Sequence, residues 1–301
     1  MASIARQQEY DLAHVIITRF NLPTPGPESL IRAKDGWLSE RWNLFRRYTI
    51  PSIRQQTSQD FHWFVYFDVE SPGWLKAEIS IHEAQGLYTP LFKLVPTAES
   101  ITEDIRSIVP ARRELITTNL DNDDGLAIDF VARLQAHTVP AARTAVYFKN
   151  GLIRTDSALF LRLDRDNAFC SVREPWSDPV TCWKDWHVLL GKHMPVSRIG
   201  GHPAWLQVVH GTNVSNRVRG KLVGPTRYRA RFRGLLEDIE QPGVKRLFLD
   251  RIAVGPVRWL RNAARAAARR AILAVAGKDG LDQLKNSLTK VRSVVTPKAA
   301  E

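Results

Sequence analysis

Three aspartates fall within four positions of this chain, at Asp121, Asp123 and Asp124. They follow an apolar, β-branched run at 115–120 that favours a strand ending in a tight turn. Carboxylates so close together repel one another, and a divalent cation such as Mg²⁺ or Mn²⁺, which also binds phosphate, is their usual neutralising partner. The alternative is a solvated turn that caps a helix expected at 126–136, although a cap needs only one aspartate.

A further candidate metal ligand is His210. It ends the apolar run 205–209 and opens a loop rich in Gly, Asn and Ser, which Arg217 and Arg219 flank. This pattern favours a metal ligand followed by a basic clamp over phosphates, with a structural role as the alternative. The predicted metal ligands are Asp121, Asp123 and His210, and the predicted loop contacts to a phosphate-bearing ligand are Asn213 and Arg217.

Strands alternate with helices through the first half of the chain. Short apolar, β-branched runs indicate strands, and apolar residues on one helical face indicate helices. In chain order the expected elements are a strand at 14–20, a helix at 37–56, strands at 61–68 and 91–95, a helix at 101–109 and a strand at 114–120. This alternation predicts a parallel, doubly wound α/β sheet, in which ligands collect beyond the carboxyl ends of the strands.

The same rule predicts that side chains at three strand ends lie along one rim. Arg19 offers a cation for a phosphate, Asp68 a carboxylate for a base or ribose, and the aspartate turn a metal for the diphosphate. Each feature alone is more often a cap or a surface ion pair, so the prediction depends on their convergence. The expected contacts to a nucleoside diphosphate on this rim are Thr18, Arg19, Asn21, Asp68, Asp121, Asn122 and Asp124.

The downstream half is expected to supply the acceptor side. Runs at 146–151 and 158–163 favour antiparallel strands around a glycine turn, and 167–174 favours a further strand. An inverting transfer needs a carboxylate or histidine that takes the proton of the acceptor hydroxyl. Glu174 is the preferred base, because it ends an apolar strand beside a Pro-Trp turn. The candidates are Glu174, Asp178, Asp185 and His187.

Several segments resemble the rhamnosyltransferase family of bacterial glycosyltransferases. They are IITRFN at 16–21, LFRRYTIPSI at 44–53, FHWFVYFD at 61–68, ITTNLDNDD at 116–124 and WLQVVHGTN at 205–213. The similarity spans roughly residues 11–220. It implies a GT-A-like, doubly wound mixed sheet with a Rossmann-like nucleotide-sugar half, in which an Asp-x-Asp motif binds a metal and the donor.

By position, the resemblance implies that Asp121 and Asp123 are the Asp-x-Asp pair, with Asp123 as the direct metal ligand. It implies that Asp124 supports these ligands or contacts the sugar. Asn119 stands where many relatives have a positive residue, so the charge beside the sugar is expected to differ.

The composition favours an intracellular globular enzyme. At 301 residues with 44% apolar content, the chain is long enough to bury a large core. Cysteine occurs only at Cys170 and Cys182, and residues 1–11 are polar and charged, so neither a disulfide scaffold nor a signal peptide is expected. The longest weakly polar stretch, 271–277, is too short to cross a bilayer. A reducing cytoplasm is the expected compartment.

The net charge of +12 is concentrated towards the end of the sequence. Residues 217–301 have 20 Lys and Arg against 7 Asp and Glu, or +13, which leaves −1 for residues 1–216. We therefore expect a glycosyltransferase domain at 1–220 and a basic, mostly helical C-terminal extension at 221–301. The amphipathic helices expected within it span 257–276 and 281–295. Such an extension can lie on an anionic membrane surface, as a peripheral contact at its inner face, or pack on the body or in a dimer.

Three functional classes fit these features. The first is a metal-dependent glycosyltransferase that moves a sugar, rhamnose by the resemblance, from a nucleotide-sugar to a cell-surface glycan or lipid-linked acceptor. The second is a nucleotidyltransferase, which should have a Gly-rich, Lys-bearing phosphate loop that residues 18–28 lack. The third is a nucleic-acid-binding protein that uses the basic end, although no recognisable reading motif accompanies the charge. Only the first class accounts for both the aspartate turn and the basic extension.

Overall fold

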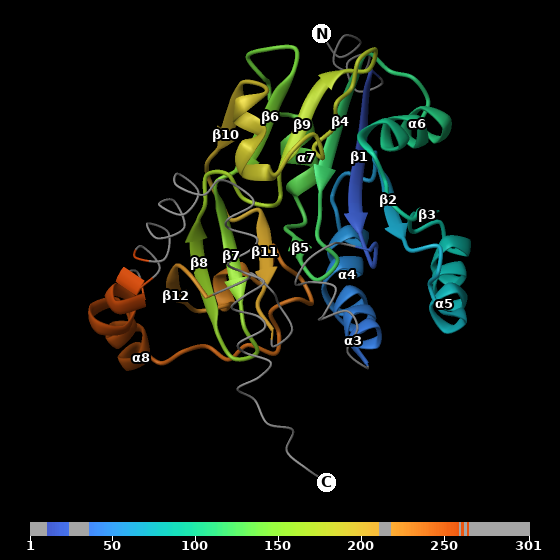
Figure 1. Cartoon of the computed structure of the whole chain (residues 1–301). Coiled ribbons are helices and arrows are strands. Elements are labelled where there is room, and N and C mark those ends of the chain that lie inside the picture. Colours follow the sequence, from blue (N-terminus) through green and yellow to red (C-terminus); the bar gives the residue numbers. More distant parts are fainter. Residues whose placement is uncertain (1–10, 24–35, 211–217, 259, 262–263, 265–301) are drawn as a thin grey trace.

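Two β-sheets organise the part of the chain that the structure describes, residues 11–23, 36–210, 218–258, 260–261 and 264 of a computed structural model (Figure 1). The larger sheet has the strand order β10-β6-β9-β4-β1-β2-β3, and the smaller has the order β12-β8-β7-β11-β5. The strands of the larger sheet are β1 (Leu12–Arg19), β2 (His62–Phe67), β3 (Thr89–Phe92), β4 (Glu114–Asn119), β6 (Thr144–Phe148), β9 (Ser171–Pro175) and β10 (Val196–Ile199). Those of the smaller sheet are β5 (Gly125–Leu126), β7 (Asn150–Arg154), β8 (Leu159–Leu163), β11 (Trp205–Val208) and β12 (Lys221–Val223).

The neighbouring strands β4, β1, β2 and β3 are parallel, because helical crossovers connect them. The crossovers are α3 (Trp37–Leu44), η1 (Phe45–Thr49) and α4 (Ile50–Arg54), then α5 (Gly73–Ala84), then α6 (Ala98–Ile108). Strand β9 pairs antiparallel with both β4 and β6. The sheet is therefore mixed, and the GT-A-like, doubly wound α/β fold expected from the sequence is confirmed.

Helices cover both faces of the larger sheet, and alternate residues of β1 point to each face. Ile16 is buried in one apolar cluster with Trp42 of α3. Its neighbour Ile17 is buried in another cluster with Ile101 and Ile105 of α6. The near-continuous apolar sequence of β1 follows from this, since a strand covered on both faces has no solvent side.

The aspartate turn connects the two sheets. It follows β4 of the larger sheet and leads into β5, which pairs antiparallel with β11 of the smaller sheet. The helix expected at 126–136 consequently begins later, as α7 (Phe130–Gln135), because Leu126 is paired in a strand. The turn therefore does not cap that helix.

The antiparallel strand pair expected downstream is shifted by a few residues. Strand β7 pairs with β8, whereas residues 144–148 form β6 in the other sheet. Gly151 is consequently a strand residue rather than a turn. A Cβ atom there would lie 1.9 Å from Cδ2 of the buried Trp205 side chain, so this position needs glycine for close packing.

Residues after 220 continue the body of the protein. Strand β12 pairs antiparallel with β8, and the segment that follows buries Phe232 and Leu236 in one cluster with Leu152 and Leu206. The domain boundary expected at 220 is therefore misplaced, since β12 and these apolar side chains belong to the folded core. The described chain then ends in α8 (Val244–Leu249), the π-helical η4 (Asp250–Val254) and further helical residues.

Much of the expected basic extension, including the helix at 281–295 and most of the helix at 257–276, lies outside the described residues. Among the helices that the structure describes, we find none with the length and hydropathy needed to cross a bilayer.

Candidate functional site

The carboxyl ends of β4, β1 and β2 lie together, as the sheet rule predicts, and two asparagines connect them. Asn122 donates from Nδ2 to the carbonyl oxygens of Arg19 at 2.9 Å and Phe20 at 2.5 Å. Asn21 accepts a hydrogen bond from the backbone N–H of Asp68 at 3.0 Å. Both side chains were predicted to contact the donor. In the structure they instead form hydrogen bonds that hold the strand ends of the rim together.

Asp123 lies between two side chains from distant parts of the chain. Its Oδ2 atom accepts hydrogen bonds from Arg41 Nη1 at 2.5 Å and from His210 Nε2 at 2.9 Å. Burial opposes ionisation of this carboxyl, but the bond from His210 and the charge of Arg41 outweigh burial and hold its pKa below the usual value. Asp123 is therefore a fixed negative charge at the rim.

The fold explains why these three residues meet. Strand β5 immediately follows the aspartate turn and pairs with β11, so His210, two residues beyond β11, arrives at Asp123. Helix α3 supplies the second partner of Asp123, Arg41. The Arg41 guanidinium lies 5.3 Å from the Trp37 ring centroid. Arg41 also donates to Asn122 Oδ1 at 3.1 Å, which fixes the turn further.

Asp121 has an exposed side chain on this rim. Surrounding protein displaces much of its water, and together with the charge of Asp123 this raises the pKa of Asp121 to about 6. Asn119 contacts it from Nδ2 at 3.3 Å and accepts a hydrogen bond from the Trp183 indole at 2.8 Å. The Arg19 guanidinium lies 4.2 Å from the Trp183 ring centroid, which places a cation beside the aspartates.

Thr18 does not face a ligand, contrary to prediction, and Asp124 takes the supporting position that was one of its two expected roles. Asp124 is fully buried, and its Oδ1 atom accepts the Val208 backbone N–H at 2.8 Å. Burial and the charges of Asp123 and Asp121 raise its pKa well above the usual value. Thr18 is also fully buried and accepts a hydrogen bond from the Trp63 indole at 3.0 Å. Both side chains are buried behind the rim and help to hold it in place.

The predicted metal ligands are only partly brought together. Asp123 and His210 supply an oxygen and an imidazole nitrogen of the kinds that divalent cations bind, and Oδ2 of Asp124 is buried without a hydrogen-bond partner. Arg41, however, already bonds Asp123, and within the described ranges no three His, Cys, Asp or Glu side chains converge to hold an ion. As placed, Asp123 and His210 offer two cation ligands rather than the three that were predicted.

A family model described as "Putative rhamnosyl transferase" matches residues 13–222, which include every strand of the larger sheet and the aspartate turn. The chain belongs to this family. Membership supports a glycosyltransferase, and it confirms the resemblance seen in the sequence. No curated protein sequence matches the chain significantly.

Solved structures align with this rhamnosyltransferase family member only distantly. TarS of S. aureus is 7% identical, with a TM-score of 0.38 over 66% of this chain and 37% of TarS, so the chain spans little more than a third of that protein. HddC from Yersinia pseudotuberculosis is 11% identical, with a TM-score of 0.38 over 64% of this chain and 91% of HddC. The inositol-1-phosphate CTP transferase from T. maritima is 10% identical, with a TM-score of 0.37 over 76% of this chain and 98% of that one.

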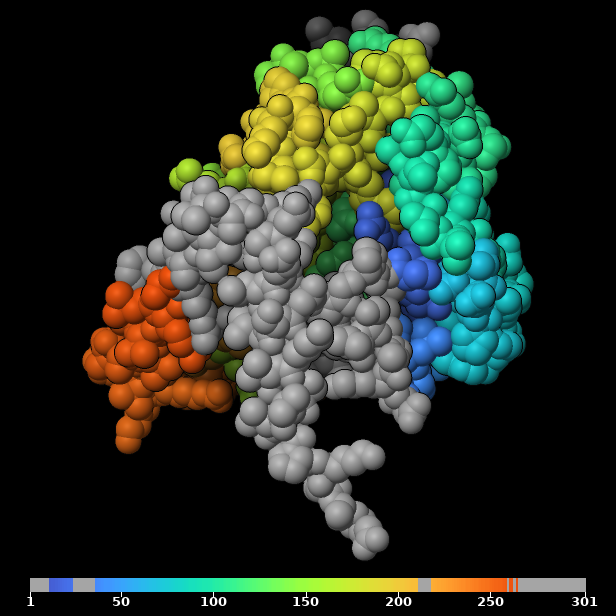
Figure 2. Space-filling view, viewed as in Figure 1, coloured from blue at the N-terminus to red at the C-terminus, as the bar shows by residue number. Residues whose placement is uncertain are grey.

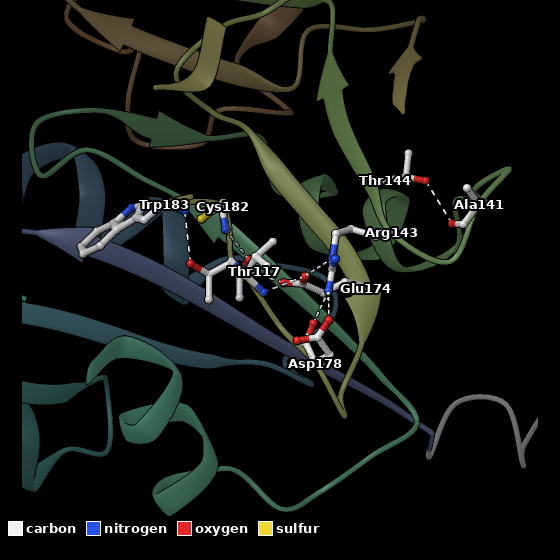
Figure 3. A network of polar contacts seen from close by, with 10 residues as sticks. Thr117, Ala141, Arg143, Thr144, Glu174, Asp178, Cys182 and Trp183 are labelled. Carbon is white, nitrogen blue, oxygen red and sulfur yellow. Dashed lines mark hydrogen bonds and ion pairs between the residues drawn. The ribbon is translucent and has the colours of Figure 1, made fainter. Parts of the chain in front are cut away.

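Glu174, the preferred base from the sequence, lies at the wrong end of the sheet. Strand β9 is antiparallel to β4 and pairs Glu174 with Leu115, six residues before Asp121, or about 20 Å along a strand. The Glu174 carboxylate is buried and accepts hydrogen bonds from Arg143 Nε at 3.0 Å and from two backbone N–H groups (Figure 3). Asp178 pairs with the same arginine at 2.9 Å. Both candidates are structural residues of this family member.

Asp185 lies nearer the rim, because the segment before it runs along β4. Cys182 donates its backbone N–H to Thr117 Oγ1 at 2.8 Å, and the next residue, Trp183, reaches Asn119 at the end of β4. The Asp185 carboxylate accepts hydrogen bonds from the Trp186 backbone at 2.7 Å and from His193 Nε2 at 2.9 Å. A carboxylate and a histidine thus meet just beyond the aspartate rim.

His187 begins the 3₁₀ helix η2 (His187–Lys192), and its backbone carbonyl accepts a hydrogen bond from the Tyr147 hydroxyl. Two further predicted contacts, Asn213 and Arg217, lie outside the described residues. Asp68 keeps its predicted place at the end of β2, where Oδ1 accepts the backbone N–H of Glu70 at 2.9 Å.

Sequence reasoning singled out neither Arg41 nor Trp183 as a functional residue. Arg41 lies in a helix with several other cations, and nothing in its spacing distinguishes it from Arg46 or Arg47. A detectable signal was available for Trp183, because the aromatic cluster at 183–186 surrounds an aspartate, as it would beside a sugar.

Proposed function

We propose that this chain transfers a rhamnosyl group from a nucleoside-diphosphate donor to a hydroxyl group of a glycan or lipid-linked acceptor. The observation that carries the proposal is the contact of Arg41 and His210 with Asp123, at the sheet edge where nucleotide ligands bind in α/β folds. The family match supports the sugar-transfer chemistry and suggests rhamnose.

On the donor side, the proposal assigns the diphosphate to the cations of the rim. Arg19, held against Trp183, presents a planar guanidinium that suits bidentate phosphate contact. Asp121, the exposed carboxylate, and Asp68 are assigned to hydroxyl or base contacts of the nucleoside and sugar. Arg41 and His210 hold Asp123 ionised and in place.

On the acceptor side, we assign the general base to Asp185. Its carboxylate would take the proton of the attacking hydroxyl while the diphosphate leaves with the bonding electrons of the glycosidic carbon. The bond from His193 orients the carboxylate, and the Trp186 backbone N–H stabilises its negative charge. The rim cations stabilise the charge that develops on the leaving diphosphate.

A divalent cation, Mg²⁺ or Mn²⁺, stays part of the proposal on grounds of charge. Arg41 offsets the charge of Asp123, whereas Asp121 adds a second carboxylate to the rim, and a bound diphosphate would add further negative charge. The cation would supply that charge balance and polarise the leaving group.

The test is a donor panel. The full chain is incubated with rhamnose and with other hexoses, each linked to different nucleoside diphosphates, and melting temperature and nucleoside diphosphate release are measured. A true donor binds only the folded state, so it should raise the melting temperature and yield diphosphate in the presence of a glycan acceptor. If no rhamnosyl donor has either effect while another hexose donor has both, the rhamnose assignment is wrong and the glycosyltransferase assignment stands.

A further inference from the structure

The helix formed by α8, η4 and the residues up to 261 exposes an unusual amount of apolar surface. Val244 is 84% exposed, Phe248 60% and Val257 65%. Single exposed apolar side chains are ordinary, but a contiguous set on one element marks an interaction surface. The exposed large apolar residues of this helix, here called the apolar ridge, are Val244, Phe248, Leu249, Ile252, Val254, Val257 and Leu260.

Only a narrow strip of the helix faces the body. Asp250 is buried, and Leu247, Gly255 and Arg258 are partly buried. The step of five residues from Asp250 to Gly255 spans the π-helical turn η4, which keeps this strip on one side of the helix. The side chains of the apolar ridge are exposed outside this strip.

Polar contacts rather than apolar packing hold this strip in place. Arg258 Nη2 donates to Asp250 Oδ1 at 2.7 Å and to the Gly220 carbonyl at 3.2 Å. Asp250 Oδ2 accepts the Leu222 backbone N–H of β12 at 3.1 Å. The helix is thus fixed to the smaller sheet while its apolar side chains stay outside. Figure 2 shows it as an orange projection at the margin of the molecule.

The charge of the helix indicates what binds the apolar ridge. Residues 244–261 have five Lys and Arg against one Asp, or +4, and that Asp is bonded to Arg258. Lys245, Arg246 and Arg251 are exposed beside the apolar side chains. Basic residues flanking an apolar face are typical of helices that lie in the head-group layer of an anionic bilayer.

Two other occupants are disfavoured by charge. A second copy of the chain would bring the same +4 segment against this one. Residues 265–301 have eight Lys and Arg against three Asp and Glu, or +5, so they have the same sign as the helix. An anionic lipid surface has the opposite sign and supplies the apolar layer that the ridge needs.

We propose that the helix from Val244 to Arg261 lies in the plane of an anionic bilayer, with the apolar ridge inserted between head groups. This goes beyond the proposed function, since it does not depend on which sugar is transferred. In Figure 1 the helix lies in the lower half of the molecule, the direction in which β1 and β4 also point. The docked enzyme would present the carboxyl ends of these strands toward a membrane-bound acceptor.

The test is sedimentation of the full chain with phosphatidylcholine vesicles, with and without phosphatidylglycerol. Wild type should bind only the anionic vesicles, and more weakly at high salt because salt screens the basic side chains. The double variant Phe248→Ser, Ile252→Ser removes two ridge residues one helical turn apart and should bind at least about tenfold more weakly. Lys245→Gln with Arg246→Gln should weaken binding to anionic vesicles in the same direction.

The matched control is Leu94→Ser with Val95→Ser, which removes two equally exposed apolar residues, 59% and 69% exposed, from another part of the surface. It should bind as wild type does. Unchanged melting temperatures and unchanged transfer to a water-soluble acceptor show that a ridge variant is folded and active, and separate this proposal from the proposed function. Equal vesicle binding by wild type and the ridge variant overturns the proposal. So does tight, salt-sensitive binding to duplex DNA without vesicle binding, or a change from dimer to monomer in the ridge variant.

Discussion

Arg41 and Asp123 are 82 positions apart in the sequence, and their side chains are joined by a hydrogen bond of 2.5 Å. The bond attaches the first helix of the α3, η1 and α4 segment to the turn that ends β4. Both side chains are nearly buried, with 11% and 7% of their surfaces exposed, so solvent screens the pair only weakly. The position of the aspartate turn therefore depends on a helix that precedes β2.

We predict that Arg41→Ala lowers donor binding and destabilises the fold. The variant removes the hydrogen bond from Arg41 to Asp123 and keeps the one from His210. It also removes the bond from Arg41 to Asn122. Losing a charged hydrogen bond in a buried site should lower the free energy of unfolding by about 1–3 kcal/mol. Urea unfolding and donor-induced thermal shift measure the two effects. Arg47→Ala is the control, since its ion pair with Asp238 is exposed and should contribute little.

Removal of divalent cations is expected to abolish donor binding. Treatment with a chelator should eliminate the thermal shift caused by a nucleoside diphosphate, and Mn²⁺ or Mg²⁺ should restore it, because the carboxylates of Asp121 and Asp123 would otherwise repel the diphosphate. Asp123→Asn should lose the same shift, whereas Asp166→Asn, which alters an exposed ion pair with Arg198, should keep it. Binding that survives chelation would mean that the arginines of the rim supply the positive charge without a metal ion.

Substitution of the proposed base distinguishes Asp185 from Glu174, the base preferred from the sequence. Asp185→Asn should reduce turnover by about 10² to 10⁴-fold with donor affinity nearly unchanged. Glu174→Gln should instead leave turnover of the folded enzyme intact and lower the free energy of unfolding by about 1–3 kcal/mol, because its carboxylate is bonded to Arg143 and two backbone N–H groups. The reverse pattern in steady-state kinetics and urea unfolding would return the base to Glu174.

The sequence sufficed to predict the elements whose signals are local. The strands near Ile16, Phe64 and Ile116 are buried on both faces, and their apolar runs end in polar residues that the parallel-sheet rule places on one rim. That rule depends only on strand order and direction, so the meeting of Asn21 with Asp68 and of Asn122 with β1 was predictable as proximity. The roles of these side chains were not, since a rim residue can face either a ligand or a neighbouring loop.

Features that depend on direction or on distant packing were not predictable. The sequence of β9 does not reveal which way the strand runs, and its antiparallel pairing with β4 moves Glu174 to the far end of the sheet. Gly151 resembles a turn residue, yet it is a strand position against which the Trp205 ring packs. Similarly, the helix that contains Arg41 was expected, whereas the face that meets Asp123 is set by how α3 lies on the sheet.

The buried histidine of β1 provides a prediction about acid stability. His14 is 1% exposed, and its Nε2 atom lies 2.9 Å from Thr118 Oγ1. Burial lowers the pKa of His14 from 6.5 to about 3. Below pH 6.5 the unfolded chain therefore binds a proton that the folded chain does not, so the free energy of unfolding falls by about 1.4 kcal/mol per pH unit between these two values.

His14→Gln removes this titration while keeping an amide that can reach Thr118. Measured by urea unfolding, the variant should be less stable than wild type at pH 8, where both states of the histidine are neutral, because the replacement disturbs a packed site. The difference should shrink as the pH falls through 6 and 5, since only wild type loses the free energy linked to His14. Stability curves that stay parallel from pH 8 to pH 5 would show instead that His14 is protonated in the folded chain, with the Thr118 hydroxyl as the acceptor of its proton.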